Sequence, residues 1–330
     1  MKNISVKITS IFLLISNCFA LETDQYLMWD FSIKDSTVGV NNYFNYQIEK
    51  GVERLNGMKN YQSLSCDKAT EVIVKEFLRN NTLTEDQIEI DLKDNNEVEL
   101  FPNPHNRREL RDLSIYKEFT SFFSKDKIFP VAPNIRVNNI DIGTDKLGHF
   151  ISLGLNYYYT YRAALNNRNE TTNDAFIAAI EYGIFTEKTY YGYLTSGVFS
   201  YADLEANFQG LIFILNICGP FNGYIKFNQA LGKWVKNAKF DIKPYVNPNW
   251  NEVYNPSHYS DKPWKKVSKV LSEKKYCERL YSNKINTFFE ELKLRDEMSF
   301  SKNYLDHKIA SGELNDNQLH SIQNFCANNP

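Results

Sequence analysis

The chain has 330 residues and a formal net charge of −2, and 42% of its residues are hydrophobic. A net charge this close to zero gives no basis for predicting a nucleic-acid partner or general attraction to anionic membranes. The length and apolar content are sufficient for one large domain or two modest domains with a sizeable core.

The first twenty residues have the pattern of a secretory signal peptide. Lys2 and Lys7 give a positive start, an apolar run extends over residues 8–15, and Ala20 offers a small residue for cleavage. The apolar run is shorter than the roughly 20 residues that a membrane-spanning helix needs. We therefore expect residues 1–20 to be removed and the mature chain to be exported.

Four cysteines follow this segment: Cys66, Cys218, Cys277 and Cys326. An exported compartment permits disulfide bonds. We predict a disulfide between Cys277 and Cys326, because both lie in the C-terminal helical region. No Cys-x-x-Cys spacing occurs, so the sequence gives no support for a zinc ribbon or a thioredoxin-like motif.

Residues 21–133 form the predicted N-terminal helical section. Apolar residues at steps of three and four predict helices over 41–55, 66–78 and 116–123. Residues 84–92 leave two interpretations open: a short helix that is capped within 84–87, and a short strand over 88–92. Pro130 and Pro133 interrupt the pattern and mark a soft boundary.

The central section, residues 134–240, contains the clearest helical signals. A helix is predicted over 146–166, a second over 175–191 after the capping run that begins at Thr171 and extends over 171–174, and a third over 201–218 with Ser200 as its cap. The apolar run in the third helix is interrupted by Asn216, which favours a buried helix over a membrane-spanning one.

Residues 241–330 form the predicted C-terminal section. Residues 241–264 are rich in proline, asparagine and aromatic side chains, which predicts an ordered, extended wrap because large aromatic residues usually pack. Helices are expected over 265–294 and, as a pair, over 301–325. The predicted fold is mainly α: a helical bundle core with an N-terminal helical section and an extended aromatic C-terminal wrap.

Polar residues recur at helical spacing inside the apolar central section. Asp145 and His149 are four residues apart and share a helix face, and Asp203, Asn207 and Gly210 share another. Burying such groups costs free energy unless they are paired or bound to something. If the three helices pack together, these groups converge, and Gly210 allows a close helix approach.

A glutamate of the second central helix is expected to join this cluster. Glu187 shares a face with Ile180 and Ile184, whereas Glu181 lies beside Ile177 and Ile184. The spacing leaves both glutamates as candidates.

The residue types of this cluster suit three roles. His149, Asp145 and Asp203 are a plausible ligand set for a divalent metal ion. Without metal, acid–base catalysis is possible, and a purely structural polar core that fixes helix register is the third role. The candidate catalytic residues are Asp145, His149, Glu187 and Asp203, and the candidate ligand-binding residues are Lys146, Glu181 and Asn207.

The order Asp145-Lys-x-x-His149-Phe, a later helical glutamate, and Asp203-x-x-x-Asn207-x-x-Gly210 resembles the motif order of the VanZ-like family. It is also similar to the YfiM-like family of small bacterial envelope lipoproteins. The resemblance covers about residues 140–220. It implies a role in the bacterial cell envelope. We expect a location in the periplasm or at the outer membrane, with an envelope lipid or cell-wall component as the candidate partner.

Three hypotheses about function follow. The first is an envelope protein whose buried cluster binds a ligand or a metal ion. The second is a metal-assisted hydrolase acting on an envelope lipid, phosphate or cell-wall precursor, which needs a cleft that reaches the cluster. The third is a scaffold that binds partner proteins through the aromatic wrap, which predicts an exposed apolar patch near Trp250 and Trp264.

Overall fold

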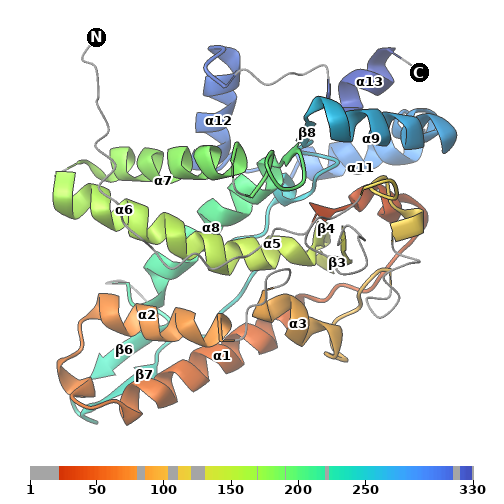
Figure 1. Cartoon of the computed structure of the whole chain (residues 1–330). Coiled ribbons are helices and arrows are strands. Elements are labelled where there is room, and N and C mark those ends of the chain that lie inside the picture. The colour runs from red at the N-terminus through yellow and green to blue at the C-terminus, as the bar shows by residue number, and fades with distance from the viewer. Residues whose placement is uncertain are drawn as a thin grey trace.

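The fold is mainly helical, with a few short two-stranded pairings (Figure 1). This arrangement confirms the predicted fold class. The computed structural model describes residues 22–79, 86–102, 111–119, 131–168, 170–189, 191–219, 223–314 and 320–328. The predicted signal peptide lies outside these ranges. Within them, none of the helices combines the length and the apolar character needed to cross a membrane.

The N-terminal section is built around two packed helices (Figure 1). Its elements are η1 (Gln25–Asp30), α1 (Thr37–Gly57), η2 (Tyr61–Ser63), α2 (Cys66–Phe77) and α3 (Gln87–Lys93). The open question at 84–92 is settled in favour of a helix, because Asp86 and Glu89 form a capping box at its start. The helix predicted over 116–123 is wrong in its described part, because residues 115–118 form turns.

The central section contains one long, nearly continuous helix and two further helices packed on it (Figure 1). Its helices are α5 (Thr144–Gly148), the π-helical η3 (His149–Leu153), α6 (Gly154–Arg168), α7 (Thr172–Glu187) and α8 (Tyr201–Ile217). The side chain of Thr171 caps α7 and that of Ser200 caps α8, as the sequence predicts. A π-helical turn widens the helix locally and is frequent at functional sites.

Gly210 of α8 lies against the long helix, as predicted. A Cβ atom on Gly210 would lie 1.9 Å from the carbonyl oxygen of Phe150, and a Cβ on Gly154 would lie 2.8 Å from Cα of Gly210. No side chain larger than hydrogen fits at this crossing unless the backbones separate. The close approach holds the π-helical turn with His149 beside the first turns of α8.

Four pairs of short strands occur in the described residues, two of them between distant segments and two as local hairpins. They are β1 (Glu22–Thr23) with β2 (Val131–Ala132), β3 (Asn134–Val137) with β4 (Ile140–Gly143), β5 (Val198–Phe199) with β8 (His258–Tyr259), and β6 (Ile225–Asn228) with β7 (Lys233–Lys236). The first pair is parallel and the others are antiparallel. The hairpins β3–β4 and β6–β7 were not predicted. Because β4 runs directly into α5, the first hairpin positions Asp145.

The C-terminal section covers the central helices. Its helical elements are η4 (Pro248–Trp250), α9 (Asp261–Glu273), α10 (Tyr276–Leu280), α11 (Asn283–Lys293), α12 (Phe300–Ala310) and α13 (Ile322–Asn328). Trp250 is 0% exposed and packs on Phe150. The segment before α9 is therefore an ordered wrap, as predicted.

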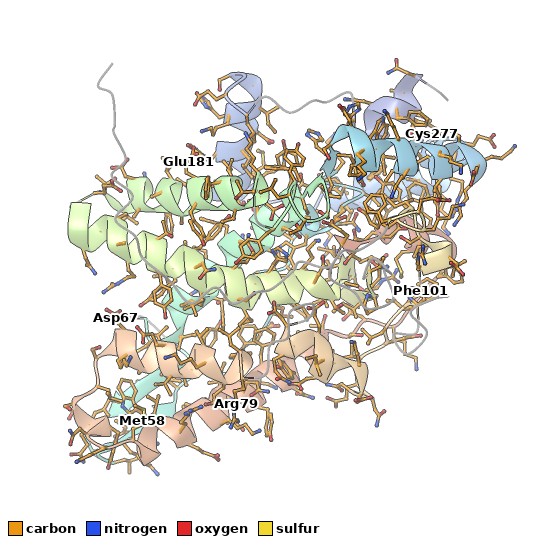
Figure 2. The ribbon with its side chains drawn as sticks, viewed as in Figure 1. Met58, Asp67, Arg79, Phe101, Glu181 and Cys277 are labelled. Carbon is orange, nitrogen blue, oxygen red and sulfur yellow. A yellow bond between two sulfur atoms is a disulfide. The ribbon has the colours of Figure 1, made fainter. Side chains whose placement is uncertain are left out.

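Two disulfide bonds tie the fold together. Cys277 pairs with Cys326, which confirms the predicted bond and links α10 to α13; Figure 2 labels Cys277 in the C-terminal helical group. Cys66 pairs with Cys218 and joins the start of α2 to the end of α8. The sequence analysis did not predict this second bond.

The largest apolar core joins all three sections. Phe44 of α1 stacks on Phe240 at 4.5 Å between ring centroids, and Phe150 stacks on Phe213 of α8 at 5.2 Å. Such aromatic pairs stabilise by about 0.5–1.5 kcal/mol beyond the burial of their area. The sections therefore share one interior, and the polar cluster described next lies within it.

Candidate functional site

Lys146 lies at the centre of a buried ion-pair cluster. Its Nζ atom is 2.8 Å from Asp145 Oδ2, 2.6 Å from Asp203 Oδ1 and 2.5 Å from Glu252 Oε1. Its side chain is 0% exposed. Burial favours the neutral amine, but the three carboxylates outweigh it and raise the pKa of Lys146 well above its usual value. Lys146 was predicted to bind a ligand, whereas in the structure its ammonium donates hydrogen bonds to Asp145 and Glu252 and forms an ion pair with Asp203.

The carboxylates around Lys146 come from distant segments. Asp145 lies in the first turn of α5, Asp203 lies in the first turn of α8, and Glu252 follows η4 in the wrap. Glu22 of β1 belongs to the same cluster, because the charges of Glu252 and Asp203 act on it. The sequence analysis missed Glu22 and Glu252. A carboxylate two residues after Trp250, in a segment predicted to pack, was a usable signal for Glu252. Nothing in the sequence signalled Glu22.

His149 extends the cluster away from Lys146. Its Nδ1 is 3.1 Å from Asn207 Oδ1, and its Nε2 is 3.4 Å from Asp203 Oδ2. When the Asn207 amide oxygen accepts a hydrogen bond from Nδ1, a neutral ring has its lone pair on Nε2. Asp203 thus presents one oxygen to Lys146 and the other to His149. The predicted convergence of Asp145, His149, Asp203 and Asn207 is confirmed.

Glu187, rather than Glu181, faces the cluster. Glu187 is 1% exposed; its Oε2 accepts the Ser200 N–H at 3.4 Å, and its Oε1 has no hydrogen-bond partner within the described structure. Glu181 instead accepts hydrogen bonds from Tyr304 and Lys308 of α12 (Figure 2). The ligand-binding role predicted for Glu181 is therefore corrected to a surface contact between α7 and α12.

The cluster holds more acidic than basic groups. It contains two basic groups, Lys146 and His149, and five carboxyl groups, each at most 3% exposed: Glu22, Asp145, Glu187, Asp203 and Glu252. Burial, reinforced by repulsion between the acids, raises the pKa of Glu252 to about 8 and those of Glu22 and Glu187 well above the usual range. At neutral pH such a set retains protons or takes up a cation.

Hydrogen bonds from neighbouring segments fix the carboxylates. Thr23 of β1 donates its hydroxyl hydrogen to Asp145. The Ser200 hydroxyl donates a hydrogen bond to Glu252 at 3.4 Å. Gln25 accepts the backbone N–H of Glu252 at 3.1 Å. These contacts hold the cluster in one geometry before any ligand arrives.

The cluster is closed off from solvent. His149 is 4% exposed, and the five carboxyl groups are more deeply buried. A hydrolase acting on a lipid or cell-wall precursor needs a cleft to its catalytic groups, so this burial favours binding or structure over turnover. The exposed patch that the scaffold hypothesis predicts is absent at the two tryptophans named, because Trp250 is 0% and Trp264 9% exposed.

Comparison with known proteins gives no match: no family model, curated protein or solved structure is similar to this chain. The resemblance to VanZ-like and YfiM-like proteins therefore stays a prediction. The function proposed below is inferred from the geometry of the cluster.

The raised carboxyl pKa values predict that the metal-free protein loses stability as the pH rises from about 6.5 to about 8. In this window folded Glu252, with its pKa of about 8, still binds a proton that the unfolded chain has released. The folded state therefore binds more protons, and its stability falls as pH rises. Asp24, with a pKa raised to about 6, and His258, with a pKa lowered to about 4, act mainly at lower pH.

Thermal unfolding in the presence of a chelator measures this effect. We expect the Tm to fall steadily across the window and the slope to flatten in Glu252→Gln. The exposed control Glu291→Gln is expected to keep the wild-type slope. A Tm that rises with pH, or a slope unchanged in Glu252→Gln, would contradict the assignment.

Proposed function

We propose that this protein is exported to the cell envelope and binds one divalent cation between His149, Glu187 and Asp203. The observation that carries the proposal is Glu187 Oε1, a buried carboxylate oxygen without a partner. One ligand atom from each of the three residues lies within 4.8 Å of the other two. One imidazole nitrogen with two carboxylate oxygens suits zinc, manganese or iron.

Lys146 decides which of two possible ligand sets is available. Asp145, Asp203 and Glu252 also lie close enough together to hold a cation. Lys146 Nζ already occupies the centre of that set, at 2.5–2.8 Å from all three. The proposed set differs in one residue from the metal set predicted from the sequence: Asp145 contacts Lys146, and we place Glu187 in the set instead.

A cation at this position offsets the excess negative charge. It supplies a partner for Glu187 Oε1 and faces the Nε2 lone pair of His149. It also joins three structural elements, namely the π-helical turn, the C-terminal end of α7 and the first turn of α8. Because the surrounding residues are sealed from solvent, the proposed role of the ion is to organise this core. In the rival hydrolase, substrate would have no route to it.

Export is the second part of the proposal. It is supported by the signal-like pattern of residues 1–20 and by two disulfide bonds, which persist in oxidising compartments. The resemblance to envelope families adds the periplasm or outer membrane as the location. We further propose an envelope lipid or cell-wall component as the partner.

Elemental mass spectrometry and calorimetric titration of the chelator-treated mature chain with Mn²⁺ and Zn²⁺ test the cation site. We expect about one ion per chain and, at a free concentration of 100 times Kd, stabilisation by about 2.7 kcal/mol. Glu187→Gln and His149→Ala are expected to lose most of the bound ion.

Glu181→Gln is the matched control, because Glu181 lies on the same helix but contacts α12. It is expected to bind metal like the wild type. Wild-type protein that takes up neither ion, or Glu187→Gln protein that binds as well as wild type, would refute the proposal. Turnover of esters or phosphates that is abolished by Asp203→Asn would instead favour the hydrolase.

A further inference from the structure

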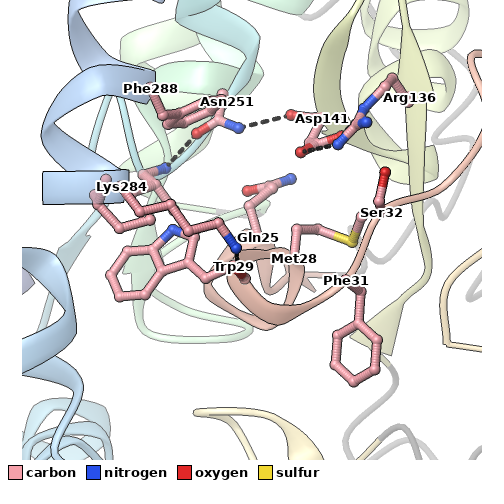
Figure 3. Close-up of a pocket in the computed structure, with 12 residues that line it drawn as sticks. Gln25, Met28, Trp29, Phe31, Ser32, Arg136, Asp141, Asn251, Lys284 and Phe288 are labelled. Atoms are coloured by element: carbon pink, nitrogen blue, oxygen red, sulfur yellow. Dashed lines mark hydrogen bonds and ion pairs between the residues drawn. The ribbon is translucent and has the colours of Figure 1, made fainter. Parts of the chain in front are cut away.

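A cavity outside the ion-pair cluster lies between η1, the β3–β4 hairpin, the C-terminal wrap and α11 (Figure 3). We infer that it binds a small aromatic monocarboxylate. Its volume is about 230 Å³, which exceeds the roughly 150 Å³ of an engineered apolar cavity that admits benzene. One aromatic ring with a short acidic side chain is therefore of suitable size.

The side-chain amide of Gln25 is the donor that points to a ligand. Gln25 is 1% exposed, and its Oε1 accepts the backbone N–H of Glu252 at 3.1 Å. Its Nε2 has no hydrogen-bond partner in the described part of the chain. Figure 3 shows this amide between Trp29 and Asp141 in the cavity wall. A buried N–H without an acceptor is costly, so an acceptor atom on a ligand here gains a bond that the protein itself does not supply.

The charged residues of the wall favour an anion. Arg136 is held by Asp141 through two bonds, of 2.7 and 3.0 Å, so these two charges offset each other. Lys284 of α11 donates one hydrogen bond to the carbonyl of Trp29 and forms no ion pair with the described carboxylates. Its ammonium has two further N–H donors. The wall therefore carries one positive charge, on the exposed Lys284, that no described carboxylate pairs with.

The remaining wall favours a ring over an extended polar ligand. It is formed largely by apolar side chains, among them Trp29, Val253, Ile285 and Phe288. The indole N–H of Trp29 is also without a partner among the described residues. An aromatic ring of the ligand would pack against these apolar side chains. Its carboxylate would lie between Gln25 and Lys284, where it would accept a hydrogen bond from the Gln25 amide and offset the charge of the ammonium.

Calorimetric titration of the full mature chain with 3-phenylpropionate tests this inference, with 3-phenylpropan-1-ol as the uncharged probe. We expect the acid to bind about tenfold more tightly than the alcohol, equivalent to about 1.4 kcal/mol. Lys284→Met is expected to weaken binding of the acid several-fold. The matched control Lys293→Met, an exposed lysine on the same helix, is expected to leave it unchanged.

A third variant fills the cavity without touching its polar groups. Ser32 is exposed at the cavity wall, so Ser32→Phe is expected to fold normally and to abolish binding. Absence of heat with 3-phenylpropionate at millimolar concentration would overturn the inference. Equal binding by wild type, Lys284→Met and Ser32→Phe would also overturn it, because the ligand would then sit elsewhere.

Discussion

Replacing Lys146 by methionine is expected to lower the free energy of unfolding by about 3–5 kcal/mol, the usual cost of removing one partner from a buried ion pair. The substitution leaves Asp145, Asp203 and Glu252 facing one another without the ammonium that now contacts all three. Urea denaturation at pH 9, above the pKa of about 8 of Glu252, measures the change. Lys293→Met, on the exposed side of α11, is the control, with an expected effect within about 0.5 kcal/mol.

A second substitution separates the lost charge from lost packing. In the Lys146→Met background, Glu252→Gln removes one of the uncompensated carboxylates and is expected to restore part of the stability. In the wild-type background the same change is expected to destabilise. The resulting coupling energy should reach about 1–3 kcal/mol, as for residues in one ion-pair network. Simple additivity, or a Lys146→Met cost below about 1 kcal/mol, would rule out the lysine as the organising charge.

Removing either disulfide bond is expected to cost about 2–5 kcal/mol, and the Cys66–Cys218 bond should be worth more than the Cys277–Cys326 bond. The reason is loop length, because the two bonds close segments with sequence separations of 152 and 49 residues. A longer closed loop restricts the unfolded chain more. Thermal unfolding of the double variants Cys66→Ala/Cys218→Ala and Cys277→Ala/Cys326→Ala measures the order.

The same bonds provide a test of export. Intact-mass measurement of chain isolated from the periplasmic fraction of a Gram-negative host is expected to show loss of residues 1–20 and four oxidised cysteines. Free thiols in that fraction, or a full-length chain confined to the cytoplasm, would count against both the disulfides and the proposed location.

The sequence by itself determined most of the helices and the spacing of most of the site residues, although the stretch predicted as helical over 265–294 is divided into α9, α10 and α11. Apolar periodicity and capping side chains are local properties, so Thr171 and Ser200 marked the starts of α7 and α8 correctly. Helical spacing put Asp145 with His149 and Asp203 with Asn207 on common faces. The lack of a side chain at Gly210 likewise predicted the close helix crossing that the structure shows.

Only the tertiary structure decided which carboxylates meet. Glu181 and Glu187 both border the apolar face of one helix, and the packing of α12 on one side and α8 on the other assigned them to different partners. Glu22 lies in a short strand and Glu252 in the irregular wrap. Neither segment has an apolar periodicity from which the position of its carboxylate could be predicted. The excess of acidic groups, which is the reason to expect a cation, comes from segments far apart in the chain. It arises only when folding brings these segments into one low-dielectric interior.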